Sequence, residues 1–276
     1  GLLSEWFMAK KYGYKVTESL FVTATLFALS LPPTVPLWIA AVGIAFGIIF
    51  GKMVFGGFGR NIFNPAITAR AFVYISFGVP LTARFIAPQT TLSLFPAGFG
   101  VFSSAADSVG AATPLITKSV SHLSLLLGNI PGSFGETSAI LIILGGAFII
   151  YKKAANWKLV VSSIGGFLLF QTILWLGGIP NTTDPLYALL SGSFLFAAFF
   201  MITDPVSASQ STDLGRVVYG ASFGILTVLI RVFSTWTAGV TFAILLVNMF
   251  APLLDYMIKQ KKAKKKAALA PKGGKA

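Results

Sequence analysis

The stretch Lys158–Ile179, KLVVSSIGGFLLFQTILWLGGI, decides the fold class, because no charged residue follows Lys158 until Asp184. A run of this length is enough for a helix to cross the hydrocarbon core of a bilayer, which takes roughly 20 residues. The rest of the chain has the same character, since 55% of its 276 residues are hydrophobic and only 11% are charged. Soluble domains carry roughly a quarter charged residues. The sequence therefore predicts an all-α polytopic membrane protein.

Apolar runs between charged residues predict about eight transmembrane segments, several of them short or interrupted by glycine and proline. They are 18–32, 36–52, 62–80, 138–152, 158–179, 186–203, 217–232 and 237–256. Short and interrupted segments are typical of half helices that line a site within the membrane. We expect a single membrane domain over residues 1–258, with an external loop over 84–137 that contains a short helix at 119–127.

The basic residues predict the orientation of the chain. Eight lysines lie from Lys259 to Lys275 and supply most of the net charge of +13. This run has no interleaved aromatic residues, which favours a disordered cytoplasmic tail over 259–276 and excludes a nucleic-acid partner. Lys152, Lys153 and Lys158 crowd one short connection, which the positive-inside rule also places in the cytoplasm. The loop 84–137 then faces the periplasm.

The chain has no cysteine and one histidine, His122, which we expect to be structural. These counts exclude disulfides, thiolate zinc sites, cysteine-ligated iron–sulfur clusters and a bis-histidine haem within this chain. Any redox reaction would need an organic cofactor.

Two halves of the chain resemble each other, which predicts an internal repeat of broken helices around a site in the membrane. Chance similarity among glycine-rich apolar segments is the alternative. The matched pairs are Ile39–Lys52 with Tyr219–Arg231, Asn61–Pro65 with Asn248–Pro252, and Leu31–Pro33 with Thr203–Pro205.

The external loop contains the first candidate site. Thr113 and Pro114 are typical of a helix start, with Thr113 as N-cap and Pro114 in the first turn. The small residues at 110–112 would let a planar group or a phosphate approach the backbone closely. Further along, Ser133 and Glu136 have the spacing of a capping box for the segment after them. The alternative for Glu136 is a contact with a cation.

Asn61 and Asn64 follow a glycine-rich turn that ends in Arg60. Two amides three residues apart would share one face of a helix and satisfy a polyhydroxylic or ring-amide ligand. The alternative is hydrogen bonding to backbone that Pro65 leaves unpaired.

Asp204 and Asp255 are acids at the ends of transmembrane segments, where an acid is a candidate for an ion path. The alternatives are a turn cap for Asp204 and, for Asp255, neutralisation of the nearby lysines.

Five blocks in the same order resemble the membrane flavoprotein family that contains the B subunit of the Na⁺-translocating NADH:quinone reductase and the D subunit of the Rnf complex. They are GGFGRNIFNPAITARAF at 56–72, GNIPGSFGETS at 128–138, MITDPVSAS at 201–209, VLIRV at 228–232 and FAILLVNMFAPLLD at 242–255. The third and fifth blocks are closer to the quinone-reductase protein. The family usually has further hydrophobic segments before the position of Gly1, so we expect a fragment or a processed product.

The resemblance implies that FMN is attached to Thr113 through a phosphoester bond, by a flavin transferase outside the cytoplasm. The family pattern is Ser/Thr-Gly-Ala-Thr with an acidic residue six positions before the threonine. Asp107, Ala112 and Thr113 match it, while Gly110 and Ala111 replace Ser/Thr-Gly.

The resemblance also implies a noncovalent riboflavin near Arg60, Asn61 and Asn64. The chain would then be an electron-transferring subunit of an NADH:quinone oxidoreductase in the bacterial inner membrane. It would work with other subunits and with a quinone such as ubiquinone. Export of Na⁺ or H⁺ would use Asp204 and Asp255. Two alternatives remain open, namely the corresponding Rnf protein and, in another class, a channel or secondary permease without flavin.

Overall fold

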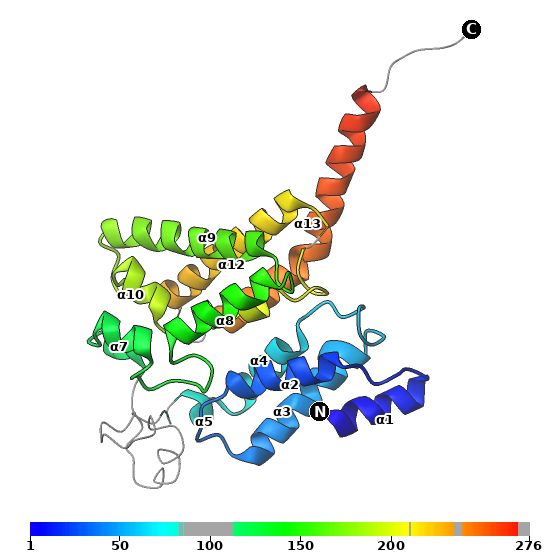
Figure 1. The fold of residues 1–276 in the computed structure, drawn as a ribbon, viewed down its shortest axis with the longest axis horizontal. Coiled ribbons are helices and arrows are strands. Elements are labelled where there is room, and N and C mark those ends of the chain that lie inside the picture. Colours follow the sequence, from blue (N-terminus) through cyan, green and yellow to red (C-terminus); the bar gives the residue numbers. More distant parts are fainter. Residues whose placement is uncertain (83–84, 86–112, 210, 235–238, 270–276) are drawn as a thin grey trace.

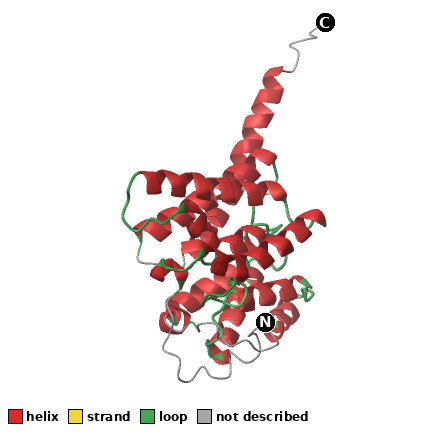
Figure 2. Cartoon of the chain, turned by 60° about the vertical axis from the view of Figure 1, so that its left-hand side comes forward, coloured by secondary structure: helices red, strands yellow, loops and turns green. Residues whose placement is uncertain are grey.

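A computed structural model describes residues 1–82, 85, 113–209, 211–234 and 239–269 of the chain. All regular elements in these residues are helices (Figure 2), which confirms the all-α prediction. The N-terminal helices are α1 (Leu2–Tyr12), α2 (Ser19–Leu29), α3 (Leu37–Ile48), the π-helical segment η1 (Ile49–Met53), α4 (Pro65–Ser76) and α5 (Gly78–Thr82). The later helices are α6 (Pro114–Thr117), α7 (His122–Leu127), α8 (Ala139–Tyr151), α9 (Trp157–Leu176), α10 (Pro185–Leu190), α11 (Phe194–Phe196), the π-helical segment η2 (Ala197–Met201), α12 (Asp213–Phe233) and α13 (Gly239–Leu269).

Three helices are long and apolar enough to cross a membrane, namely α9, α12 and α13. Three shorter apolar stretches accompany them, at Ser19–Leu29, Leu37–Met53 and Ala139–Tyr151. Every one of the eight predicted segments contains helical residues. Only α9, α12 and α13, however, are long enough to cross a membrane. The number eight therefore stays a prediction.

Helices α9 and α12 pack closely because glycines form their interface. A Cβ at Gly220 would lie 2.7 Å from the Leu159 carbonyl oxygen, and one at Gly224 would lie 2.3 Å from that of Ser163. Small residues allow helix backbones to approach in this way. A stack of rings then joins these two helices to α11, with Phe194 lying between Phe167 and Phe223 at centroid distances of 4.1 and 5.3 Å.

A buried ion pair fixes α1 to η1. The Lys52 ammonium lies 2.8 Å from the Glu5 carboxylate, and both side chains are almost fully buried. Lys52 also donates to the hydroxyls of Thr17 and Ser19, and the Thr17 backbone N–H donates to Glu5. All the ion-pairing groups are thus hydrogen-bonded, as a buried pair requires.

The segments matched as a repeat differ in local structure. Residues 39–52 cover most of α3 and most of η1, whereas 219–231 lie inside the unbroken α12. Asn61–Pro65 leads into α4, whereas Asn248–Pro252 lies within α13. The closest local parallel is between η1 and η2, each of which continues an α-helix and ends in a turn. The repeat itself stays a prediction.

The tail is helical over most of its length, which corrects the expectation of disorder from residue 259. Helix α13 continues to Leu269 and projects from the body of the molecule (Figure 1). The reason is composition, because lysine, alanine and leucine are strong helix formers. The short helix expected at 119–127 is confirmed as α7.

Candidate functional site

Thr113 occupies the N-cap position of α6, with Pro114 in the first turn, as the sequence predicted. Its backbone carbonyl accepts hydrogen bonds from the N–H groups of Ile116 and Thr117, at 2.9 and 3.1 Å. Its side chain makes no cap hydrogen bond. The hydroxyl is therefore not used to start the helix. The associated residues Asp107, Gly110, Ala111 and Ala112 lie outside the described part of the chain.

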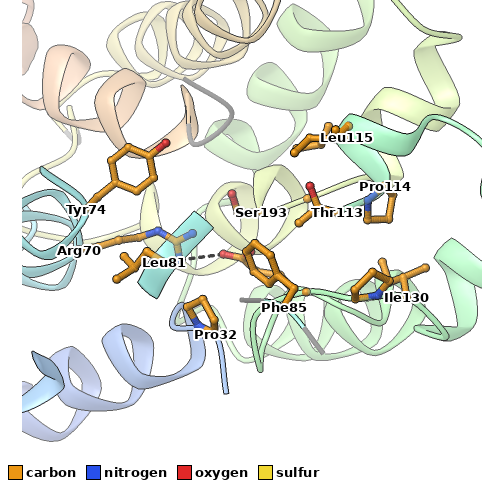
Figure 3. A pocket seen from close by; sticks show the side chains of 15 residues that line it. Pro32, Arg70, Tyr74, Leu81, Phe85, Thr113, Pro114, Leu115, Ile130 and Ser193 are labelled. Carbon is orange, nitrogen blue, oxygen red and sulfur yellow. Dashed lines mark hydrogen bonds and ion pairs between the residues drawn. The ribbon is translucent and has the colours of Figure 1, made fainter. Parts of the chain in front are cut away.

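Thr113 lines a small cavity of about 60 Å³, which we call the Thr113 cavity. Figure 3 shows Arg70, Ser193 and Thr113 around it, together with apolar side chains. Its walls come from six separate regions of the chain. The lining residues are Pro32, Arg70, Tyr74, Leu81, Phe85, Thr113, Pro114, Leu115, Ile116, Ile130, Pro131, Gly132, Glu136, Gly192 and Ser193.

An ion pair between Arg70 and Glu136 lies in the wall of the Thr113 cavity. Arg70 Nη1 lies 3.0 Å from Glu136 Oε1 and also donates to the Ser30 carbonyl. Burial raises the pKa of the Glu136 carboxyl, although the positive charge of Arg70 opposes this rise. The expected capping box is wrong, because Ser138 caps α8 by accepting from the Leu141 N–H. The positive partner that the structure gives Glu136 is the Arg70 side chain, and a contact with a free cation stays a prediction.

A second and larger cavity, of about 840 Å³, brings together three residues that the sequence singled out. Asn61, Asn64 and Asp204 all line it, although Asp204 is far from the asparagines in sequence. Arg60 and Asp255 are not among its lining residues. We call it the asparagine cavity. Its other walls are formed by Thr17, Glu18, Ser19, Val22, Thr23, Leu26, Lys52, Phe58, Pro65, Ile149, Ala154, Ala155, Phe200, Thr203, Pro205 and Val206.

The two asparagines do not share a helix face, which corrects that expectation. Asn64 is the N-cap of α4, and its Oδ1 accepts from the Ala66 N–H at 2.9 Å. Its Nδ2 donates to the Met201 carbonyl at the end of η2, at 3.2 Å. Asn61 precedes the helix and donates to the Phe63 carbonyl at 3.0 Å. Both amides therefore bond to backbone, and both also lie in the wall of the asparagine cavity.

Asp204 organises the turn after η2, as one of its alternatives predicted. Its carboxylate accepts from the Val206 N–H at 3.0 Å and from the Ser207 hydroxyl at 2.7 Å. Burial raises the pKa of Asp204. Asp255 accepts instead from the Ser209 hydroxyl. Among the described residues no group of three or more acidic, histidine or cysteine side chains is placed to hold a metal ion.

The two cavities lie at opposite ends of the same three helices. Helix α2 starts at Ser19 beside the asparagine cavity and is followed by Pro32 at the Thr113 cavity. Helix α4 runs from the asparagine cavity to the Thr113 cavity, and α8 runs in the reverse direction. Leu26 of α2 still lines the asparagine cavity, and Arg70, in the middle of α4, already lines the Thr113 cavity, so the two cavities approach each other within these helices.

Sequence reasoning missed Arg70, Gly192 and Ser193 as site residues. For Arg70 a signal existed, because it is a charged residue inside the predicted segment 62–80. For Gly192 and Ser193 no local pattern distinguishes the residues from ordinary turn residues, since only the fold brings them to Thr113.

The long apolar helices, together with shorter ones that end in π-helical segments, indicate a multi-pass membrane protein that encloses two cavities. Residues 1–264 match the model of one protein family, described as the NQR2, RnfD, RnfE family. The chain belongs to this family.

Curated relatives named as the B subunit of Na(+)-translocating NADH-quinone reductase match most of the chain. The protein from Klebsiella pneumoniae subsp. pneumoniae is 39% identical over 267 residues. Those from Ectopseudomonas mendocina and Yersinia pestis are 40% identical over 262 residues and 38% identical over 278 residues. Each alignment covers 92% of this chain and 62–63% of the relative. The chain thus spans a little under two thirds of the length of these relatives.

Proposed function

We propose that the chain is an electron-transferring membrane subunit of an ion-translocating NADH:quinone oxidoreductase and that it carries FMN covalently on Thr113. Family membership and the names of the relatives support the complex, and favour the quinone reductase over the Rnf complex. The observation that carries the attachment site is the Thr113 hydroxyl, which lines a cavity and makes no cap hydrogen bond.

The described residues fit a phosphate linked to Thr113. The Thr113 cavity is lined by the Arg70 guanidinium and by the hydroxyls of Thr113 and Ser193, which are groups that bind phosphate. Its volume of about 60 Å³ suits the phosphate end of the cofactor and is too small for a flavin ring system. The cofactor, when bound, supplies electron transfer in single-electron steps.

Attachment requires a separate enzyme because a threonine hydroxyl is a weak nucleophile. The Thr113 oxygen would form a bond to the FMN phosphorus of FAD while the pyrophosphate bond breaks. AMP leaves, and the hydroxyl proton passes to the transferase.

The test is flavin fluorescence of the protein band after denaturing gel electrophoresis, with the flavin transferase co-expressed. We expect fluorescence on the wild-type band, its loss in Thr113→Ala, and its retention in the control Thr117→Ala, four residues along the same turn. A wild-type band without fluorescence would contradict covalent attachment and favour a channel or permease.

We place the second, noncovalent flavin, riboflavin, in the asparagine cavity. Its volume of about 840 Å³ is within the range of cofactor sites. Asn61, Asn64 and the Ser19 hydroxyl supply amide and hydroxyl groups to its wall. The amount of riboflavin that acid precipitation releases from the protein should be lower in Asn61→Leu than in the wild type. It should stay at the wild-type level in the control Asn156→Ala, which alters an asparagine outside this cavity. Equal release from both variants would contradict this site.

We also propose an ion path through Asp204 and Asp255, each of which is held in a separate hydrogen-bonded turn or helix. Na⁺ uptake by the assembled complex in proteoliposomes tests it. We expect Asp204→Asn to lower uptake per electron transferred, and an unchanged ratio would remove Asp204 from the path.

We also propose eight membrane crossings in the bacterial inner membrane, with the lysine-rich C-terminus in the cytoplasm and the loop 84–137 outside. The two cavities support this orientation, because Lys52 lines the asparagine cavity and Lys152 and Lys153 follow the end of α8 beside it. Thr113 lies at the other end of the same helices, where an external transferase would reach it. Other subunits and a quinone are the expected partners.

A further inference from the structure

The wall of the Thr113 cavity contains polar groups that make no hydrogen bond to another described residue. Ser193 precedes α11, and its side chain makes no cap hydrogen bond. None of the hydrogen bonds between described residues uses its hydroxyl, or the Nε and Nη2 groups of Arg70. Arg70 makes its contacts to Glu136 and to the Ser30 carbonyl through Nη1 alone. One edge of the guanidinium thus has no partner among the residues that the structure describes, and we take it as the edge that binds a ligand.

The charged side chains that the structure describes around the cavity leave one positive charge unbalanced when Glu136 is ionised. Arg70 is paired with Glu136. Arg231 lies behind the cavity wall, where its Nη2 is 3.2 Å from the position that a Cβ on Gly192 would take. Arg231 donates to the carbonyls of Ala188 and Ser191. Among the described residues, two half-buried arginines thus lie near one carboxylate, and a phosphodiester, which carries a single negative charge, would balance them.

We propose that Arg70 and Ser193 bind the phosphoester group on Thr113, with Glu136 holding Arg70 in position. This inference rests on the proposed attachment at Thr113. Arg70 is the charge partner and donates through the edge that faces the cavity, as arginine does to phosphate. Ser193 donates its hydroxyl proton to a second phosphate oxygen. The two residues would fix the phosphate, and the cavity, at about 60 Å³, has no room for the ring system.

The structure offers a reason for this use of two distant residues. Arg70 lies on α4 and Ser193 just before α11, so a phosphate bound between them would join the N-terminal helices to the later ones. Figure 3 shows the two side chains and Thr113 around the same space. The covalent bond alone would leave the phosphate free to rotate about the threonine side chain.

The test uses full-length chains in the assembled complex with the transferase co-expressed. Ser193→Ala is the primary variant, because it breaks no ion pair. Arg70→Gln combined with Glu136→Gln removes the guanidinium without leaving a buried carboxylate unpaired. Lys118→Gln is the control, since it removes a positive charge five residues from Thr113 but outside the Thr113 cavity. Elution on gel filtration and the thermal midpoint identify variants that fold.

The readouts are in-gel fluorescence, the ³¹P resonance of the bound phosphodiester and the anisotropy of flavin fluorescence in the native protein. We expect every variant to keep the fluorescent band. In Ser193→Ala and in the double variant the ³¹P resonance should move most of the way to its position in denatured protein, and the anisotropy should fall. Wild-type resonance and anisotropy in folded Ser193→Ala and double variants would overturn the inference. A wild-type chain without a fluorescent band would instead refute attachment at Thr113.

Discussion

Gly192 is the residue on which the shape of the Thr113 cavity depends most directly. Its φ is +70°, in the left-handed region, and a Cβ would lie 2.7 Å from Leu115 Cδ1. We predict that Gly192→Ala lowers the free energy of unfolding by about 1–3 kcal/mol, through backbone strain together with a steric clash. The thermal midpoint in detergent measures it. Gly59→Ala is the matched control, because Gly59 has a φ of +87° but open space around it. Gly59→Ala should lower the free energy of unfolding by less than Gly192→Ala does. An equal loss in the two variants would mean that the clash with Leu115 contributes nothing.

Glu136, also a single residue, makes the stability of the folded protein depend on pH. Its pKa is raised above the ordinary value of 4.5 by burial, so the folded protein binds this proton more tightly than the unfolded chain does. The stabilisation is complete below about pH 4.5 and is lost as the pH rises through the raised pKa. We predict that the thermal midpoint of Glu136→Gln falls less than that of the wild type between about pH 4.5 and 7. Parallel curves would show that Glu136 is not the group responsible.

At the scale of elements, the pairing of α9 with α12 depends on small residues. A Cβ at Gly224 would lie 2.3 Å from the Ser163 carbonyl oxygen and 2.5 Å from the Phe167 nitrogen, so the helices would have to separate. We predict that Gly224→Ala lowers the free energy of unfolding by about 1–3 kcal/mol, the usual range for overpacking. Gly165→Ala is the control on α9, where no atom lies within 4 Å. It should be neutral or stabilising, because alanine favours a helix over glycine.

The sequence predicts an element or a contact when the residues that define it are close together along the chain. The existence of α9 and α12 follows from local hydropathy, and the start of α6 follows from the Thr113–Pro114 pair. The Arg70–Glu136 pair joins residues 66 apart, and the bond from Asn64 to the Met201 carbonyl spans 137 residues. No local pattern reports such contacts. For this reason the capping box at Ser133 was wrong, and Ser193 was missed.

At the scale of the whole molecule, the two cavities distinguish one end of the membrane domain from the other. Asn61, Asn64 and Asp204 were each singled out by local features, and the fold places them around one cavity. Thr113 lies at the other end of the helices that border this cavity. Helices of 11 to 13 residues are too short to span a hydrocarbon core of roughly 30 Å. The proposed sites, approached from opposite faces of the membrane with broken helices between them, would account for these short elements.

The orientation that follows can be tested with single cysteines, because the chain has none of its own. Ser119 and Lys152 are both exposed. Ser119 follows α6, which borders the Thr113 cavity, and Lys152 follows α8, which ends beside the asparagine cavity. We predict that a membrane-impermeant maleimide labels Ser119→Cys in intact spheroplasts, and labels Lys152→Cys only after the membrane is permeabilised. Lys262→Cys, on the exposed end of α13, should behave as Lys152→Cys does. Labelling of Lys152→Cys without permeabilisation would reverse the orientation and place Thr113 in the cytoplasm, beyond the reach of an external flavin transferase.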